Sequence, residues 1–410
     1  MVAQGRHPGR YNARPFIRGL RLLKQFLQVV LSLYLALACS LASAASVVFL
    51  NPGKSTEAYW LSYAQFMQAA ATDLGMPLQV IYAERDPQRM VEQARALLQG
   101  SHPPDYLVFV NEEYAGPEIL RLSKGSSVKL FAVSSTLTAD QQSLIGQSRE
   151  RYPNWIGSLV PNDEEAGYLM ASRLIERGRA LQSAGEMQLL AFSGTKQTPA
   201  AQFRERGLQR ALAEHPDVRL RQLVYSEWNR QRAYEQAQQL LPRHPDATLI
   251  WAANDEMAFG AMRAAEELGR VPGKDLLFAT LNNSAEVLQA RLDERVSVLV
   301  SGHFTAGGWA MVLLHDYAAG LDFAARGGKD RQDALFMQLD KPQSQRLLPN
   351  TSPVKHSLCT RVSTGVPSLT SPFTNARCSM PSMVLLYATQ VKPPHSVGTA
   401  AEPTRSTSRS

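Results

Sequence analysis

Short apolar runs alternate with longer amphipathic stretches along the chain from residue 46. Apolar runs of about four to six residues have the length of buried strands, and longer stretches with apolar residues three and four apart are typical of helices. The first part of the chain is predicted to contain strands at 47–50, 78–82, 106–110 and 128–133, with helices over 57–74, 88–98 and 114–124. This alternation predicts βαβ units and a parallel sheet, because parallel strands covered on both faces are apolar throughout.

The alternation restarts near residue 155. Further strands are predicted at 155–159, 187–192, 220–225, 248–252, 276–281 and 296–300, with helices over 164–177, 200–214, 230–241, 256–268 and 284–292. Two runs of this kind hold more strands than one sheet of usual width. The pattern therefore predicts two α/β lobes of similar size.

Basic charge is concentrated at the two ends of the sequence. The chain has a formal net charge of +7, of which residues 1–44 contribute +6 and residues 351–410 contribute +5, so the part between them carries −4. A groove for nucleic acid would need its basic residues on the folded body. Nucleic acid is therefore excluded as the main partner.

The N-terminal segment has the order of a secretory signal peptide. Arginine and lysine residues precede the apolar run Phe26–Ala38, and the small residues Ala42, Ser43 and Ala44 follow. We predict that residues 1–44 are a signal peptide, cleaved near Ala44, and that the protein is exported to the periplasm. An uncleaved anchor and a lipoprotein attached at Cys39 stay open as alternatives.

Residues 351–410 differ from the rest of the chain. Serine, threonine and proline dominate this segment, and neither the helical nor the strand period persists in it. We predict that it is disordered, or aberrant through a frame change in the coding sequence.

Motifs of enzymes and metal sites are missing from the sequence. The three cysteines, Cys39, Cys359 and Cys378, lie outside the predicted lobes. The segment Pro52–Thr56 stands where a phosphate-binding loop would, but the glycine that such a loop needs at position 48 is Val48. No nucleophile or paired acid and base is evident, so we predict neither an enzyme nor a cofactor or metal site.

Aromatic residues at the predicted strand ends indicate a sugar site. Tyr59 and Trp60 begin the first helix, and one of the two is expected in the core. Trp228 lies in a strand-to-helix loop, and His303 follows the last predicted strand. Sugar C–H faces pack on aromatic rings, and ligands of parallel α/β sheets bind in the loops after the strands.

Three segments resemble one known family. Asn254–Ala261, with the sequence NDEMAFGA, is similar to the N-D-x-M-A-x-G-A signature of type I periplasmic sugar-binding proteins, which the cores of LacI-type regulators share. Arg204–Gly207 resembles that family's R-x-x-G helix start, and Pro161–Gly167 resembles its crossover into the second lobe. The resemblance covers about residues 46–340. A repressor is excluded, because an export signal stands where its DNA-binding domain would be.

The resemblance implies an α/β fold of two doubly wound, Rossmann-like lobes joined by three chain crossings. These crossings are expected near 159–161, 281–284 and 301–304. The N-terminal lobe is expected to span 46–160 and to be completed by about 303–325. The C-terminal lobe is expected to span 161–302 and to be completed by about 335–349.

The resemblance also implies the site residues. The expected ligand contacts are Tyr59, Trp60, Ser134, Ser135, Arg204, Trp228, Asn254, Asn282 and His303. Asn282 stands where the family usually has an aspartate, and Ser134 and Ser135 stand where ribose-type members have an Asp-Arg pair. An amide cannot accept two hydroxyl protons with charge assistance. The site therefore favours a modified sugar, a polyol or a sugar-derived signal such as a borate-bearing autoinducer, with Asp163 as a further carboxylate or a helix cap.

The family's function is the binding of a small solute by closure of two lobes around it. We expect such a ligand here and a membrane permease of an ABC importer as the partner. The alternative is a sensory subunit whose partner is a membrane histidine kinase or cyclase, which includes the autoinducer-binding branch of the family.

Overall fold

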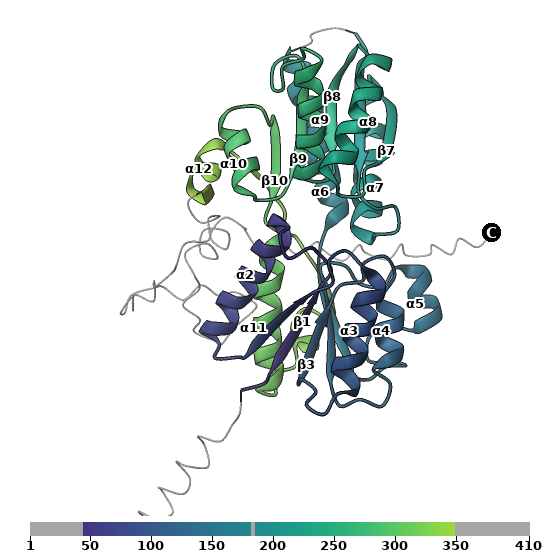
Figure 1. Cartoon of the computed structure of the whole chain (residues 1–410), viewed down its shortest axis with the longest axis vertical. Helices are drawn as coiled ribbons and strands as arrows, with labels where there is room; N and C mark the ends of the chain where they lie inside the picture. Colours follow the sequence, from purple (N-terminus) through teal and green to yellow (C-terminus); the bar gives the residue numbers. More distant parts are fainter. Residues whose placement is uncertain (1–43, 182–184, 349–410) are drawn as a thin grey trace, which may run out of the picture. The chain divides into compact units, whose positions relative to one another are not determined.

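The computed structural model describes residues 44–181 and 185–348, which form two parallel-sheet lobes (Figure 1). The first sheet has the strand order β11-β5-β4-β3-β1-β2, and its strand pairs are parallel. Its strands are β1 Val47–Asn51, β2 Leu78–Tyr82, β3 Tyr106–Phe109, β4 Lys129–Val133, β5 Trp155–Pro161 and β11 Asp330–Asp333.

The second sheet has the order β12-β10-β9-β8-β6-β7. Its pairs are parallel except at the edge, where β12 runs antiparallel to β10. Its strands are β6 Met187–Ser193, β7 Val218–Tyr225, β8 Ala247–Ala252, β9 Leu277–Leu281, β10 Val298–Ser301 and β12 Met337–Leu339. Two α/β lobes with parallel sheets confirm the predicted fold class.

Helices connect the strands of each lobe. The first lobe contains α2 Ala58–Asp73, α3 Pro87–Gln99, α4 Gly116–Leu122, α5 Ala139–Ile145, α11 Ala306–Ala318 and the short 3₁₀ turn η2 Phe323–Ala325. The second contains α6 Asp163–Leu181, α7 Pro199–Glu214, α8 Arg230–Arg243, α9 Asp255–Glu267, α10 Ala285–Leu292 and α12 Lys341–Leu347. The 3₁₀ turn η1 His303–Thr305 follows β10 and leads into α11. Within the first lobe, α2 and α11 lie side by side (Figure 1).

The predicted strands and helices between 47 and 301 are present, with ends shifted by up to four residues. The periodicity did not indicate α5, α11, α12, β11 or β12. β11 has the sequence Asp-Arg-Gln-Asp, in which no apolar residue marks a buried face. Its strand conformation follows from pairing with β5 at the edge of the first sheet, a contact across about 170 residues of chain that local pattern does not encode.

One predicted crossing is wrong. Residues 282–284 lead from β9 into α10, and α10 packs against β10 and α12 within the second lobe. The third crossing instead lies at residues 334–336, between β11 of the first sheet and β12 of the second. The other two follow β5 and β10, close to the predicted positions. The segment that returns to the first lobe also extends past the predicted 325, because β11 belongs to the first sheet.

Helices α6 and α7 approach closely through two glycines. A Cβ atom on Gly167 would lie 2.0 Å from the backbone oxygen of Arg204, and one on Gly207 would lie 2.0 Å from that of Glu164. No residue with a side chain fits at this distance. The glycine of the R-x-x-G pattern, Gly207, therefore holds the middle of α7 against the start of α6.

The segment Pro52–Thr56 serves packing in this fold. A Cβ atom on Gly53 would lie 1.9 Å from the Trp60 ring, so the loop crosses directly over that indole. Trp60 itself is 3% exposed and packs with Phe49 and Tyr63 in the core of the first lobe.

The predicted signal peptide, up to residue 43, and the predicted tail at 351–410 lie outside the described residues. Among the helices that are described, none combines the length and apolar composition that crossing a membrane requires.

Candidate functional site

Five side chains form a continuous column between the two lobes. The Tyr59 ring stacks on the His303 ring at a centroid distance of 4.6 Å, and His303 stacks on Phe336 at 4.7 Å. The Arg204 guanidinium carbon lies 5.9 Å from the centre of the Phe336 ring and 5.6 Å from that of Trp228. We call Tyr59, His303, Phe336, Arg204 and Trp228 the interlobe column.

The column draws on both lobes and on two crossings. Tyr59 begins α2 of the first lobe, whereas Arg204 on α7 and Trp228 after β7 belong to the second. His303 and Phe336 come from the second and third crossings. A ligand that contacts this column would touch both lobes, which is the requirement for closure on binding.

Arg204 is 6% exposed and is held by two partners in its own lobe. Its Nε donates to Asp163 Oδ1 at 2.7 Å, and its Nη1 donates to the Ala253 carbonyl at 2.8 Å. Burial raises the pKa of the Asp163 carboxyl, and the Arg204 charge opposes that rise. The guanidinium has five N–H donors, so this anchoring leaves donors for a ligand.

His303 is 1% exposed and uncharged. Burial, assisted by the charge of Arg204, lowers the pKa of its imidazole well below the ordinary value. Its Nδ1 is buried and has no hydrogen-bond partner among the described residues. Burial also raises the pKa of the neighbouring Tyr59 phenol, which the Arg204 charge and a hydrogen bond with the Ser134 hydroxyl oppose.

Trp228 has an unusual backbone conformation for a large residue. Its φ is +58°, and its ring lies so close to Gly194 that a Cβ there would be 2.1 Å from it. The buried indole Nε1 has no partner in the described part of the chain. Gly194 thus clears space that fixes the indole beside Arg204, with a donor left for a ligand.

Asn254 and Asn282 lie at strand ends of the second lobe and are both buried. The Asn254 Oδ1 caps α9 by accepting from the Met257 N–H at 2.9 Å. The Asn282 Nδ2 donates to Asp255 Oδ1 at 2.6 Å, and Ser284 Oγ donates to Asp255 Oδ2 at 2.6 Å. Burial raises the pKa of Asp255 to about 6. Asp255 therefore orients the Asn282 amide.

The remaining predicted contacts are less central. Trp60 belongs to the core of the first lobe, as was expected for one member of the Tyr59–Trp60 pair. Ser134, at a φ of +62°, lies beside Tyr59, whereas Ser135 is buried and its backbone pairs with Val133 and Asn111. A ligand role for each predicted residue stays a prediction.

Sequence reasoning missed two residues of this region. Phe336 lies in a segment without any motif, and Asn283 was assigned to a crossing that does not exist. The Asn283 Nδ2 donates to Ser62 Oγ on α2 of the other lobe at 2.6 Å, and its buried Oδ1 has no partner in the described residues. Neither contact has a local sequence signal, because Asn283 and Ser62 are 221 residues apart and Phe336 is placed by the pairing of β11 and β12 with strands of different sheets.

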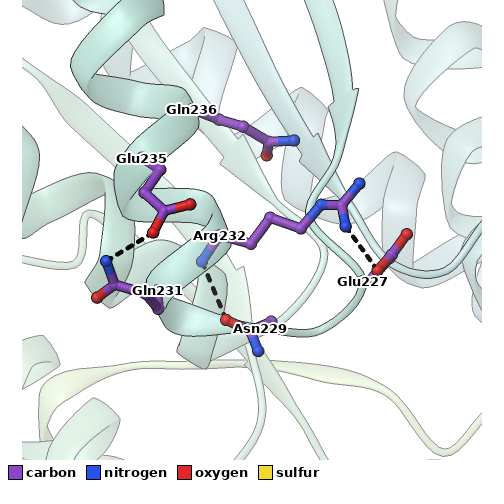
Figure 2. A pocket seen from close by; sticks show the side chains of 6 residues that line it. All are labelled: Glu227, Asn229, Gln231, Arg232, Glu235 and Gln236. Atoms are coloured by element: carbon purple, nitrogen blue, oxygen red, sulfur yellow. Dashed lines mark hydrogen bonds and ion pairs between the residues drawn. The ribbon is translucent and has the colours of Figure 1, made fainter.

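A polar pocket lies at the start of α8, near Trp228 (Figure 2). Arg232 points to Glu227 with a contact of 2.8 Å, and Gln231 donates to Glu235 at 2.9 Å. Its polar groups are thus paired with one another, and it includes none of the column residues. No group of three or more histidine, cysteine, aspartate or glutamate residues suited to a metal ion occurs in the described residues.

The model of the periplasmic binding protein domain matches residues 47–322. The chain belongs to the periplasmic binding protein domain family. Its resemblance to type I periplasmic sugar-binding proteins, noted from the three motifs, is confirmed.

Several known proteins similar to this family member are named as binding proteins. A crystal structure of a periplasmic sugar-binding protein from Pseudomonas fluorescens is 59% identical, covers 74% of this chain and 89% of its own, and has a TM-score of 0.69. The ribose import binding protein of Escherichia coli (strain K12) is 30% identical over 148 residues, which are 36% of this chain and 46% of that protein. The ribose import binding protein of Bacillus subtilis (strain 168) is 22% identical, over 67% of this chain and 85% of its own. The chain spans about half the length of the first curated relatives it matches.

Proposed function

We propose that this protein is a periplasmic solute-binding protein that closes around a small, neutral, polyhydroxylated ligand and presents it to the permease of an ABC importer. The observation that carries this proposal is a buried set of polar groups at and beside the interlobe column, in which Trp228, His303 and Asn283 each have an unpartnered atom and Arg204 keeps spare donors. In that set Arg204, Trp228 and Asn283 belong to the second lobe and His303 to the second crossing, while Tyr59 brings the first lobe to the same column.

The polar groups match hydroxyl chemistry. Arg204 and the Trp228 Nε1 offer donors, Asn283 Oδ1 offers an acceptor, and His303 Nδ1 donates or accepts according to its tautomer. A hydroxyl group donates one hydrogen bond and accepts others, so a polyol or sugar satisfies both kinds of partner. Leaving these buried groups unpaired costs about 1–3 kcal/mol each, which is free energy that a matching ligand recovers on binding.

The charges favour a neutral ligand. The Arg204 cation already has Asp163 as its counter-ion, His303 is uncharged, and Asp255 is enclosed by Asn282, Ser284 and the backbone of Glu256. A charged ligand would bring an uncompensated charge into this buried site, which is strongly unfavourable.

The relatives support a sugar or polyol and an import role. They include proteins named for ribose import, for xylitol binding and for galactofuranose binding. None of these names refers to a sensory role, so the importer is the function that we propose. The family and the N-terminal pattern of residues 1–44 together support a periplasmic location.

Isothermal titration of the purified protein with D-ribose, xylitol, D-allose and L-arabinose tests the proposal, with L-glutamate as a charged probe. We expect at least one neutral compound to bind and Arg204→Ala to abolish that binding. Arg206→Ala is the matched control, because Arg206 is an exposed arginine on the same helix. Binding of L-glutamate alone, or of nothing in an enlarged panel of sugars and polyols, would overturn the proposal.

A further inference from the structure

Phe336 occupies the third crossing between the lobes. It directly precedes β12, which pairs with β10 in the second sheet, and it follows β11, which pairs with β5 in the first. Neighbouring Leu335 and Met337 pack against the hydrophobic core. Phe336 also packs against this core, and in addition its ring stacks on His303 at an interplanar angle of 27° and faces the Arg204 guanidinium.

This position gives the ring a role beyond packing. It is partly exposed, although it lies between two buried polar residues, His303 and Arg204. Because His303 stacks on the ring and the Arg204 guanidinium lies over it, a ligand meets only the part of the ring that these neighbours leave uncovered. That part is apolar and offers no ordinary hydrogen bond to a hydroxyl group. A ligand hydroxyl directed at this ring would lose its hydrogen bonds to water without replacement.

We propose that Phe336 is a specificity-determining ligand contact, which forms an apolar wall beside the Arg204 donors and selects ligands that present a C–H face or a deoxy carbon there. This inference rests on the proposed function, since it names the part of the ligand that the same site distinguishes. Arg204 then binds hydroxyl groups on one edge of the ligand. Phe336 requires that the edge of the ligand beside it carry no hydroxyl group.

The test compares Phe336→Asn and Phe336→Leu with the wild type on two matched pairs of probes. The pairs are D-ribose with 2-deoxy-D-ribose and D-galactose with D-fucose, its 6-deoxy form, each titrated calorimetrically. We expect Phe336→Asn to weaken the binding of the preferred probe by about tenfold or more and to shift preference toward the fully hydroxylated member of a pair. Phe336→Leu, which keeps an apolar wall, should retain the wild-type preference.

Leu335→Ala is the control for a loosened crossing, because Leu335 belongs to the same connection and packs on the core. If Phe336→Asn and Leu335→Ala weakened the binding of all probes equally and left the preference within each pair unchanged, Phe336 would be a structural residue. That result would overturn the inference. Unchanged binding in Phe336→Asn would overturn it as well, while the proposed function stood. If the wild type bound no sugar or polyol, both proposals would fall.

Discussion

The pairing of Arg204 with Asp163 places two charges in a part of the second lobe that water barely reaches. Such a pair is poor evidence of stability, since both ions lose their hydration when they are buried. Its value here lies in geometry. The Asp163 carboxylate and the Ala253 carbonyl hold the guanidinium plane of Arg204 in one orientation. The N–H donors that they leave free are therefore held in a fixed orientation as well.

Replacing this pair should affect the free energy of unfolding and the ligand affinity differently. We expect Asp163→Asn, which leaves the buried Arg204 charge without its counter-ion, to lower the free energy of unfolding by about 3 kcal/mol. The double variant Asp163→Leu with Arg204→Met should recover most of that loss but bind no ligand, because it lacks the donors. Urea unfolding and calorimetric titration of the same samples measure the two effects. A double variant that still bound the ligand would show that Arg204 acts only in the fold.

Asp255 predicts a pH dependence. Its folded-state pKa of about 6 lies above the ordinary value of about 3.9. Between these two values the folded chain holds a proton that the unfolded chain has released, so stability falls as the pH rises through this window. Compared with Asp255→Asn, the free energy of unfolding of the wild type should decrease by up to about 3 kcal/mol between pH 4 and pH 6.5. Urea unfolding across this range tests the prediction, and parallel profiles for the two proteins would contradict it.

At the scale of elements, the placement of Arg204 depends on how closely α6 and α7 pack. The two glycines at their contact let backbone meet backbone, so that Asp163 at the start of α6 reaches Arg204 in α7. The same device recurs between α8 and α9, where a Cβ on Gly260 would lie 2.1 Å from the Arg230 oxygen. Helix contact and site geometry are therefore linked in this lobe.

Gly207→Ala should therefore damage both the fold and the site. Its new methyl group would meet the Glu164 backbone, and we expect a loss of about 3 kcal/mol or more in the free energy of unfolding, the upper end for an overpacked contact. Gln209→Ala, at an exposed position of the same helix, should change stability by less than about 0.5 kcal/mol. Thermal and urea unfolding compare the two, and equal stability of both variants would show that α6 and α7 can separate without penalty.

At the scale of the whole molecule, hydrogen bonds between described residues join the lobes at two places besides the column. Asn283 donates to Ser62, and Gln202 donates to the Tyr114 hydroxyl at 3.1 Å. The first is buried on the Asn283 side, whereas Tyr114 is 41% exposed. The net contribution of a hydrogen bond is larger where removing one partner leaves a buried group unpaired.

We expect Ser62→Ala to weaken ligand binding about three- to tenfold, mainly through faster dissociation, because it leaves the buried Asn283 amide without its partner across the lobes. Tyr114→Phe, at the exposed contact, should change the affinity by less than about twofold. Stopped-flow measurement of dissociation rates distinguishes the two variants. Equal effects would show that the Ser62–Asn283 contact has no special part in holding the lobes together.

The sequence by itself determined the order of most strands and helices and the division into two lobes, and it supplied most of the candidate ligand contacts of the second lobe, whose role stays a prediction. These follow from local signals: apolar periodicity, the R-x-x-G spacing that brings α7 against α6, and the asparagine that caps α9. Arg204, Trp228 and Asn254 were found because each belongs to a motif or a strand-to-helix loop. Each such signal lies within a few residues of the position it predicts.

Only the tertiary structure decided the third crossing, the edge strand β11 and the members of the column that the crossings contribute. The loop at 282–284 contains polar residues suited to a crossing, yet pairing of β9 with β10 keeps the chain in the second lobe. Phe336 meets His303 because strands from both sheets position its short connection. Contacts between segments this far apart depend on the packing of the whole fold, and no local period or motif in the sequence records them.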